Sequence, residues 1–470
     1  MMSRFPTTRI TFCLLLALVT FAHPQTQLIP RSVLFGNPER TSPQISPDGS
    51  MLAYLAPDQG VLNIWVRTLG QTDDRAITND RKRGIRNLFW QYDSKNILYA
   101  QDQNGDENWR VYQTNIATRQ TRDLTPFDKV RADIVALEPS HPETVLIQLN
   151  KRDPKVFDIY RVNLQSGELT LDTENPGDVA GFQPDHDLQV RAAQVTTPEG
   201  GTVIRVRDNV KSPWRELMKW GPEETLGNVA AFSPDNTALW VITSLNANAA
   251  RLVSVDLATA KSTVIAEDPQ FDATFVLADP RTNKLQAVEF VRERRDYQIL
   301  DPALQPDFDV LKKVRDADIS DISRDLADDK WVVTFQGDDA PIYYYLYDRA
   351  TKKATVLFSN RPALENYKLA KVKPIQYKAR DGMTIYGYLT TPAESSRRIY
   401  PWLFSRTAVR GDAIYGDTIP MRNGSRIAAM PSCSRISGPL PATANNTLML
   451  VIASGPAPCA PICSTARTGR

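Results

Sequence analysis

A short strand-turn-strand pattern recurs along the chain, and this repeat limits the possible folds more than any other feature of the sequence. In its clearest copy, an apolar segment runs into the turn Ser46–Gly49 (SPDG), and β-rich stretches follow at Met51–Leu55, Asn63–Thr68 and Arg75–Thr78. Proline, aspartate and glycine in this order supply the fixed φ and the positive φ that a tight turn requires. The first unit is therefore expected to be a four-stranded antiparallel sheet.

Six further units follow with drift in their sequences, at intervals of roughly 43 to 51 residues, which is the spacing of propeller blades. Their first apolar segments are Ile85–Trp90, Ile134–Leu137, Val179–Phe182, Val229–Phe232, Phe275–Ala278 and Ile319–Ile322. One unit cannot bury both faces of its sheet, so radial stacking of all seven is the stable arrangement. We therefore predict an all-β fold with a seven-bladed β-propeller over residues 31–370. The alternative is a β-sandwich of many hairpins, which the regular period disfavours.

Aromatic residues on or beside the expected strands favour packing between blades over ligand binding. The tryptophans concerned are Trp65, Trp90, Trp109, Trp240 and Trp331. Consecutive side chains of a strand alternate between its faces, so the run Tyr343–Tyr345 is expected to direct at least one tyrosine into the core.

The first 22 residues are typical of an export signal. Arg4 and Arg9 precede the apolar run Ile10–Phe21, which is too short for a stable membrane anchor, and Ala22 closes a suitable cleavage site. We expect a signal peptide at residues 1–22 and a periplasmic or extracellular protein. A buried N-terminal helix is the alternative. No later stretch is apolar enough to cross a membrane.

Charge and cysteine content exclude several classes of function. The chain has 56 lysines and arginines against 54 acidic residues, so nothing favours nucleic acid as a partner. No cysteine lies between Cys13 and Cys433, so the propeller must be held by its core and not by disulfides. Cys459 and Cys463 have no histidine or second cysteine pair nearby, and we predict neither a metal site nor a cofactor. The oligomeric state stays open.

Four segments resemble the prolyl oligopeptidase family of serine peptidases, most closely its acylaminoacyl-peptidase and dipeptidyl-peptidase-like branch. They are Asp102–Trp109, Asn150–Pro154, Leu188–Ala193 and Lys378–Leu389. The resemblance covers the propeller and implies that residues 371–392 begin an α/β-hydrolase domain, with a hairpin that turns at Arg380-Asp381-Gly382. It also implies peptide substrates and acyl transfer to a serine in the intact family.

The catalytic signature of that family is missing from this sequence. The resemblance leads us to expect His-Gly-Gly-Pro after the hairpin, then Gly-x-Ser-x-Gly, an aspartate and a histidine. Neither of the two motifs nor any histidine follows Pro392. The three histidines are His23, in the signal region, and His141 and His186, in expected loops and turns. We therefore assign no catalytic residue and expect the chain to be inactive.

Residues 393–470 have an aberrant composition. From Glu394 onward there are nine arginines, three acids and no lysine, without strand or helix periodicity, and we expect this tail to be disordered or poorly packed. A shifted reading frame explains it: with suitable synonymous codons, Pro401–Gly411 reads M-V-V-F-P-H-G-G-P-W in the frame that starts at each third codon base. In the same frame Cys433–Asn445 can read Q-P-N-F-R-A-S-T-G-Y-G-K. We infer a frameshift between about Pro392 and Pro401, and hence a truncated peptidase domain.

Charged loops of the propeller are the candidates for substrate binding, namely Glu107, Asn108, Arg152 and Asp153. Glu107 could bind the α-ammonium group of a peptide. The alternative is that Asp102, Asp106 and Glu107 pair with Arg110 or nearby cations, and that Arg152 and Asp153 form a structural pair.

Two other functions stay possible from the sequence. One is a periplasmic propeller similar to that of the TolB translocation protein, which would bind peptides or proteins without catalysis. The hairpin at residues 380–390 counts against it. The other is a hydrolase with an unrecognised site in the tail, against which the lack of histidine there argues.

Overall fold

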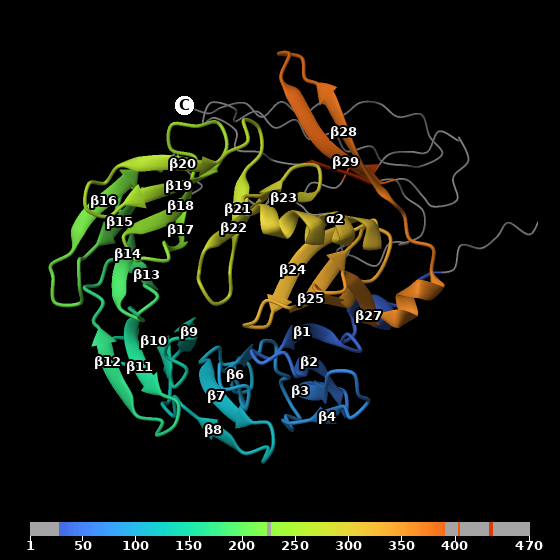
Figure 1. Cartoon of the computed structure of the whole chain (residues 1–470), viewed down its shortest axis with the longest axis horizontal. Helices are drawn as coiled ribbons and strands as arrows, with labels where there is room; N and C mark the ends of the chain where they lie inside the picture. Colours follow the sequence, from blue (N-terminus) through green and yellow to red (C-terminus); the bar gives the residue numbers. More distant parts are fainter. Residues whose placement is uncertain (1–27, 223–226, 391–402, 405–431, 436–470) are drawn as a thin grey trace, which may run out of the picture.

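Seven antiparallel sheets follow one another along the chain and close into a ring (Figure 1). The computed structural model describes residues 28–222, 227–390, 403–404 and 432–435, so the predicted signal peptide lies outside the described residues. Every blade is built from strands that are contiguous in sequence, with the first strand near the centre of the ring and the last at its rim. The predicted seven-bladed propeller is confirmed.

The strands are short and follow the predicted repeat closely. Blade 1 comprises β1 (Thr41–Ile45), β2 (Met51–Asp58), β3 (Val61–Thr68) and β4 (Arg75–Ala76). Blade 2 comprises β5 (Phe89–Trp90), β6 (Asn96–Gln101), β7 (Arg110–Asn115) and β8 (Thr121–Asp123). Blade 3 comprises β9 (Ala132–Leu137), β10 (Thr144–Leu149), β11 (Asp158–Asn163) and β12 (Leu169–Thr173). Blade 4 comprises β13 (Val179–Pro184), β14 (Val190–Thr196), β15 (Thr202–Val206) and β16 (Arg215–Trp220).

The second half of the ring departs from the repeat at one blade. Blade 5 comprises β17 (Gly227–Phe232), β18 (Ala238–Thr243), β19 (Arg251–Asp256) and β20 (Ser262–Ala266). Blade 6 comprises β21 (Ala273–Ala278), β22 (Leu285–Val291) and β23 (Arg295–Ile299), followed by the 3-10 helix η1 (Pro302–Leu304) and helix α2 (Gln305–Val314). Blade 7 comprises β24 (Asp318–Arg324), β25 (Lys330–Gln336), β26 (Tyr343–Asp348) and β27 (Lys353–Ser359). The short helices α1 (Arg31–Phe35) and η2 (Pro362–Asn366) flank the ring.

Helix α2 stands where the sequence predicted no helix. Asp301 caps the preceding η1 by accepting from the backbone N–H of Ala303 at 3.1 Å. Two prolines in this stretch, at positions 302 and 306, lack the N–H that a fourth strand would donate. Phe308 and Leu311 on α2 are fully buried against Trp331 of blade 7. The helix therefore packs between blades 6 and 7.

A buried carboxylate fixes α2 to blade 7. Asp307 accepts from the hydroxyl of Tyr347 at 2.9 Å and from Nε and Nη2 of Arg349 at 3.1 and 3.0 Å, and it also binds the ammonium of Lys352. Its side chain is fully buried, so these partners compensate the cost of desolvating its charge.

The seam between blades 1 and 7 closes the ring. In the part of the chain that the structure describes, no strand crosses this seam. Instead, one buried apolar cluster contains Ile45, Tyr54, Val332 and Phe358. The backbone N–H of Ile45 donates to Oγ of Ser323 at 3.1 Å, and further hydrogen bonds join the two blades from Leu326 N to Pro47 O at 2.8 Å and from Lys330 Nζ to Gly49 O at 3.0 Å.

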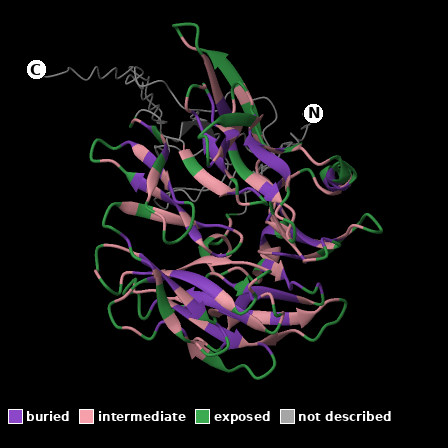
Figure 2. Cartoon of the chain, turned by 60° about the vertical axis from the view of Figure 1, so that its left-hand side comes forward, coloured by how far each residue is buried: buried purple, intermediate pink, exposed green. Residues whose placement is uncertain are grey.

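Buried side chains run through all the blades, as the purple strands in Figure 2 show. Trp331 is fully buried and Trp90 and Trp240 are nearly so, in agreement with their predicted packing role. Tyr344 and Tyr345 are both buried, which confirms the prediction for the tyrosine run. Within the part of the chain that the structure describes, no helix is long and apolar enough to span a membrane.

A hairpin follows the ring, formed by β28 (Val372–Lys378) and β29 (Thr384–Thr390). Its turn contains Gly382 at φ +86°, which agrees with the predicted Arg380-Asp381-Gly382 turn. In the tail, where no strand pattern was seen, β31 (Ser432–Arg435) pairs with β29, and β30 (Leu403–Phe404) pairs with β31. The rest of the tail lies outside the described residues.

The anchoring of α2 can be tested by substitution. We expect Asp307→Ala to lower the free energy of unfolding by about 3 kcal/mol, because it leaves buried cationic partners without their carboxylate. Urea unfolding followed by tryptophan fluorescence measures the change. Asp309→Ala, on the exposed side of the same helix, is the matched control and should change stability by less than about 0.5 kcal/mol. Equal effects of the two substitutions would contradict the anchoring role.

Candidate functional site

The antiparallel path of the blades places their connections on two opposite faces. Loops between second and third strands share one face with the connections between blades, which we call the loop face. Turns between first and second strands lie on the other, which we call the turn face. The predicted site loops, 102–108 between β6 and β7 and 151–153 between β10 and β11, both lie on the loop face.

The hairpin is attached to the loop face. The hydroxyl of Tyr388 on β29 donates to the carbonyl of Glu293 in the β22–β23 loop, and the hydroxyl of Tyr386 donates to Oε1 of Gln270 at 3.2 Å. The ring of Phe271 meets that of Tyr386 edge-on at 5.7 Å. Whatever follows the hairpin therefore leaves the propeller on the same face as the predicted site loops.

The loop of Glu107 and Asn108 is held by an ion pair whose carboxylate, Asp102, is buried below it. Asp102 has a fully buried side chain and accepts from Nε of Arg83 at 2.9 Å, where the sequence had suggested Arg110 or another nearby cation. Burial by itself would raise the pKa of Asp102, but the hydrogen bonds from Arg83 and from the backbone N–H of Glu107 outweigh it and hold that pKa below 3.8. Glu107 itself is exposed and has a positive φ of 59°. The N–H of Asn108 donates to Asp106 at 3.1 Å.

Arg152 has a different partner from the predicted one. Its guanidinium binds Asp158 through Nε and Nη2, both at 2.9 Å, and Nη2 also donates to the carbonyl of Asn175 at 2.9 Å. Asp153 instead accepts from the backbone N–H of Lys155 at 2.9 Å. The predicted Arg152–Asp153 pair is therefore wrong, because the fully buried Asp158 six residues on offers a forked contact that the adjacent residue cannot. Arg152 therefore stabilises blade 3 through these contacts.

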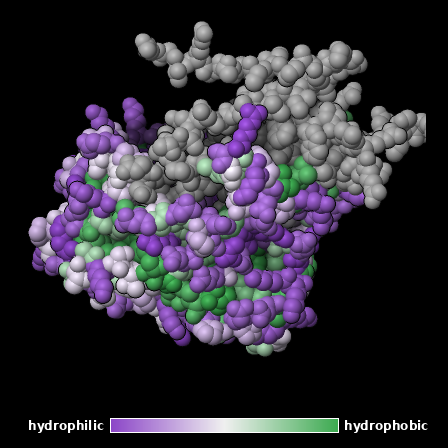
Figure 3. All heavy atoms as spheres, turned by 90° about the horizontal axis from the view of Figure 1, so that it is seen from above, coloured by the Kyte–Doolittle hydropathy of each residue, from purple (hydrophilic) through white to green (hydrophobic). Residues whose placement is uncertain are grey.

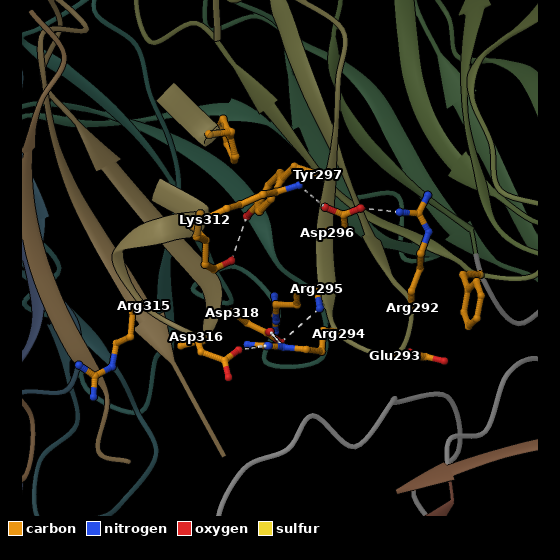
Figure 4. A pocket seen from close by; sticks show the side chains of 14 residues that line it. Arg292, Glu293, Arg294, Arg295, Asp296, Tyr297, Lys312, Arg315, Asp316 and Asp318 are labelled. Carbon is orange, nitrogen blue, oxygen red and sulfur yellow. Dashed lines mark hydrogen bonds and ion pairs between the residues drawn. The ribbon is translucent and has the colours of Figure 1, made fainter. Parts of the chain in front are cut away.

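A charged pocket of about 540 Å³ opens on the loop face beside the hairpin, between blades 6 and 7. Two chains of ion pairs line it, as Figure 4 shows. In one, Lys312 and Arg292 both bind Asp296, and Arg292 also binds Asp268 at 3.1 Å. In the other, Arg294 binds Asp316 at 2.7 Å and Asp318 at 2.6 Å.

The charges of this pocket stabilise one another. A hydrogen bond from Arg294 lowers the pKa of Asp316, and burial of Arg294 is outweighed by its two aspartates, so its own pKa is raised. Asp316 and Arg294 therefore both stay ionised at neutral pH.

The pocket residues were not predicted from the sequence, and none of Glu107, Asn108, Arg152 and Asp153 lines the pocket. The run Arg292–Arg295 (RERR), between the second strand and the start of the third, was the available signal. Asp296 follows it directly, but the other aspartate partners, Asp268, Asp316 and Asp318, come from elsewhere in the chain.

Neither described histidine lies on the loop face. His141 and His186 lie in the β9–β10 and β13–β14 turns, on the turn face, as the sequence predicted. Among the described residues no group of three or more histidines, cysteines and acids is placed to hold a metal ion. The part of the surface visible in Figure 3 is mainly hydrophilic, with hydrophobic side chains showing in smaller patches.

Acid titration tests the Arg83–Asp102 pair. Because the pKa of Asp102 is lowered on folding, the pair contributes stability above pH 3.8 and loses it as the pH falls through the folded value. We expect Asp102→Asn to lower the free energy of unfolding at neutral pH by about 1–3 kcal/mol, and the difference from the parent chain to shrink between about pH 5 and pH 2. Asp128→Asn, an exposed partner of Arg110, is the control and should have little effect at any pH. A pH-independent effect of Asp102→Asn would contradict the assignment.

Comparison with known proteins places the propeller in a family. No protein-family model matches the chain. Dipeptidyl aminopeptidase BIII from Pseudoxanthomonas mexicana is 38% identical over 369 residues, which are 78% of this chain and 53% of that protein. Dipeptidyl peptidase family member 6 from Caenorhabditis elegans is 29% identical over 430 residues, which are 86% of this chain and 56% of that protein. The chain thus spans about half the length of the curated relatives it matches.

Solved structures agree with the fold. A prolyl endopeptidase structure matches with a TM-score of 0.60 at 14% identity, covering 85% of this chain and 61% of the other. A puromycin hydrolase structure matches with a TM-score of 0.55 at 15% identity, covering 84% and 66%. At these identities the likeness concerns the fold alone, whereas the dipeptidyl peptidase relatives share the sequence as well. The chain belongs to the prolyl oligopeptidase family, and its described residues comprise that family's seven-bladed propeller.

Proposed function

We propose that this chain is the propeller portion of an exported serine peptidase acting on peptides, and that its 470 residues as they stand do not cleave peptides. One observation carries the proposal: a closed propeller of this family has a hairpin attached to its loop face, at the edge of a charged pocket. A propeller that only bound partners would not need that hairpin. In the intact family, a hydrolase domain beyond the hairpin would face the loops.

The chemistry of such an enzyme is acyl transfer. A serine attacks the peptide carbonyl, a histidine carries its proton to the leaving amine, and backbone N–H groups hold the oxyanion. The propeller's contribution is selection: the ring covers the site, admits peptides and short unfolded segments, and excludes folded proteins by size.

The loop face offers charged groups of both signs to a peptide. Glu107 remains our candidate for the α-ammonium group, because it is exposed at the tip of a loop that the Arg83–Asp102 pair holds rigidly. Asn108 and Asp153 are half-buried on the same face. Arg152, whose guanidinium is bound to Asp158, is proposed to position its loop and not to touch the peptide.

Lack of turnover is inferred from the residues that peptide cleavage would need. The 470 residues contain no Gly-x-Ser-x-Gly sequence. Of the three histidines, His141 and His186 lie in turns of the face opposite the hairpin, where neither can serve a nucleophile beyond β29. A shifted reading frame between about Pro392 and Pro401 would account for the loss, because with suitable synonymous codons the alternative frame can encode His-Gly-Gly-Pro directly after the hairpin.

A labelling assay tests this function. We expect the purified chain to show no covalent labelling by a serine-reactive fluorophosphonate probe and no hydrolysis of aminoacyl- or dipeptidyl-nitroanilides, because it has no activated serine. Chymotrypsin, labelled in parallel, is the positive control. Stoichiometric labelling would overturn the claim that the chain lacks a nucleophile.

A peptide-binding assay distinguishes the two remaining roles, the propeller of a peptidase and a propeller that only binds partners. If a fluorescent peptide binds to the unlabelled chain, Glu107→Gln should weaken binding of a free N-terminus and leave an acetylated peptide unaffected. Asp128→Asn, at another exposed carboxylate of the loop face, is the matched control. Tight capture of a folded protein with no peptide binding would instead favour a TolB-like binding propeller.

A further inference from the structure

The turn of blade 6 behaves differently from the other turns of the turn face. Residues 279–284, between β21 and β22, reach toward the middle of the ring in Figure 1, where a propeller has its central channel. On one side the turn contacts blade 4 across the neighbouring blade 5: Nδ2 of Asn283 lies 2.8 Å from Nδ1 of His186. On its other side Arg281 helps to line a hollow of about 480 Å³.

That hollow is walled by turns from three other blades. Pro47 and Asp48 come from blade 1, residues 92–94 from blade 2, and Leu326 and Ala327 from blade 7. A single turn that shares a hollow with blades 1, 2 and 7 and a hydrogen bond with blade 4 must span the mouth of the channel. We call residues 279–284 the plug.

His186 is the residue that holds the plug. Its Nε2 lies 3.1 Å from the carbonyl oxygen of Phe232 in blade 5, and because a carbonyl only accepts, Nε2 must carry a proton. In the neutral ring Nδ1 is then an acceptor, which matches the donating amide of Asn283. His186 also accepts from blade 3 through its own carbonyl, 3.2 Å from Oγ of Ser140.

A second group competes for the same ring nitrogen. Oε1 of Glu138, in the blade 3 turn, lies 3.0 Å from Nδ1 of His186. A carboxylate oxygen requires a proton on Nδ1, whereas the amide nitrogen of Asn283 requires a lone pair there. The two contacts are therefore satisfied in different protonation states of the ring.

The other charged groups around the ring are already bound. Asp185 accepts from Arg191 at 3.2 Å, and Asp187 accepts from the amide of Asn236 at 3.2 Å. In blade 5, Asp235 binds Ser233 and Thr237. In blade 6, Asp279 accepts from N–H groups of its own turn, and Arg281 faces the hollow. The hydroxyl of Tyr92, near Glu138, has a pKa raised to about 12 and stays neutral. Glu138 is thus the group that forms an ion pair with His186 when its ring is protonated.

We infer that the plug closes this mouth of the channel and that His186 controls it: the neutral ring holds Asn283, and the protonated ring binds Glu138 and releases the plug. Acid therefore loosens the plug, and the channel end opposite the hairpin opens. This inference does not depend on the hydrolase domain or on the proposed function.

The direction of the pH effect follows from the local chemistry. Burial would lower the pKa of His186, but Glu138 outweighs it and raises that pKa above 6.5. The Glu138–His186 ion pair therefore contributes stability below pH 6.5 and loses it as the pH rises through the folded value. The hydrogen bond from Asn283 to His186 has the opposite pH dependence. It forms as the pH rises through the same range.

Titration of His186 by NMR tests the competition in the full-length chain. Asn283→Gly should raise the pKa of His186, because only the neutral ring loses a partner, and glycine tolerates the φ of +57° at this position. Glu138→Gln should lower it. Asn104→Gly, at a φ of +56° on the loop face, and Glu143→Gln, exposed in the same turn as Glu138, should leave it unchanged. An unchanged or lowered pKa in Asn283→Gly would overturn the inference.

Trypsin cleavage after Arg281 tests the closure itself. At about pH 8, where the neutral ring holds the plug, Asn283→Gly and His186→Phe should each speed cleavage about fivefold, the factor that corresponds to one ordinary hydrogen bond. The double variant should be cut no faster than either single variant, because both remove the same contact. Asn104→Gly should be cut like the parent chain. Cleavage that is unaffected by Asn283→Gly, or additive effects in the double variant, would show that His186 does not hold the plug.

Discussion

The seam between blades 1 and 7 is the contact on which the rest of the molecule depends. Other neighbouring blades are close in sequence, but here Tyr344 Oη lies 3.1 Å from Oγ1 of Thr41, 303 residues away. No strand is exchanged across this seam, so the entropy of closing the ring is offset by apolar burial around Ile45 and Phe358 and by a few hydrogen bonds. Only a closed ring brings seven sets of loops to one face and seven turns around one channel.

Charge on the loop face is dense yet mostly paired. The carboxylates of Asp102 and Asp158 are fully buried, and each binds an arginine that its neighbours in the sequence do not predict. Such pairs cost desolvation and add little net stability, but removing one partner is expensive, so they fix loop positions firmly. The exposed groups above them, Glu107 among them, are therefore presented on a rigid support, which is what peptide recognition requires.

The repeat predicted the blades well because each strand and turn is encoded locally: Ser46–Gly49 forms its turn, and Met51 begins β2 as expected. The repeat could not predict contacts between residues that lie far apart in the sequence. Arg152 binds Asp158 and not Asp153, and the pocket of Arg292 and Arg294 depends on acids from α2's C-terminal side and from the preceding blade connection. Helix α2 was missed because its apolar face is meaningful only against Trp331 of the next blade. For the same reason the sequence did not predict the plug, because its partners belong to four other blades.

We propose that a peptidase domain behind this family propeller has been lost to a change of reading frame. The chain spans about half of its relatives, and the hairpin is formed by residues 372–390. With suitable synonymous codons, the family's next motif can be read in another frame directly after it. Resequencing the gene across the codons for Pro392–Pro401 tests this most directly. The account predicts an inserted or deleted base there, with a frame beyond it that encodes His-Gly-Gly-Pro and then Gly-x-Ser-x-Gly. An unbroken frame that encodes the present tail would contradict it.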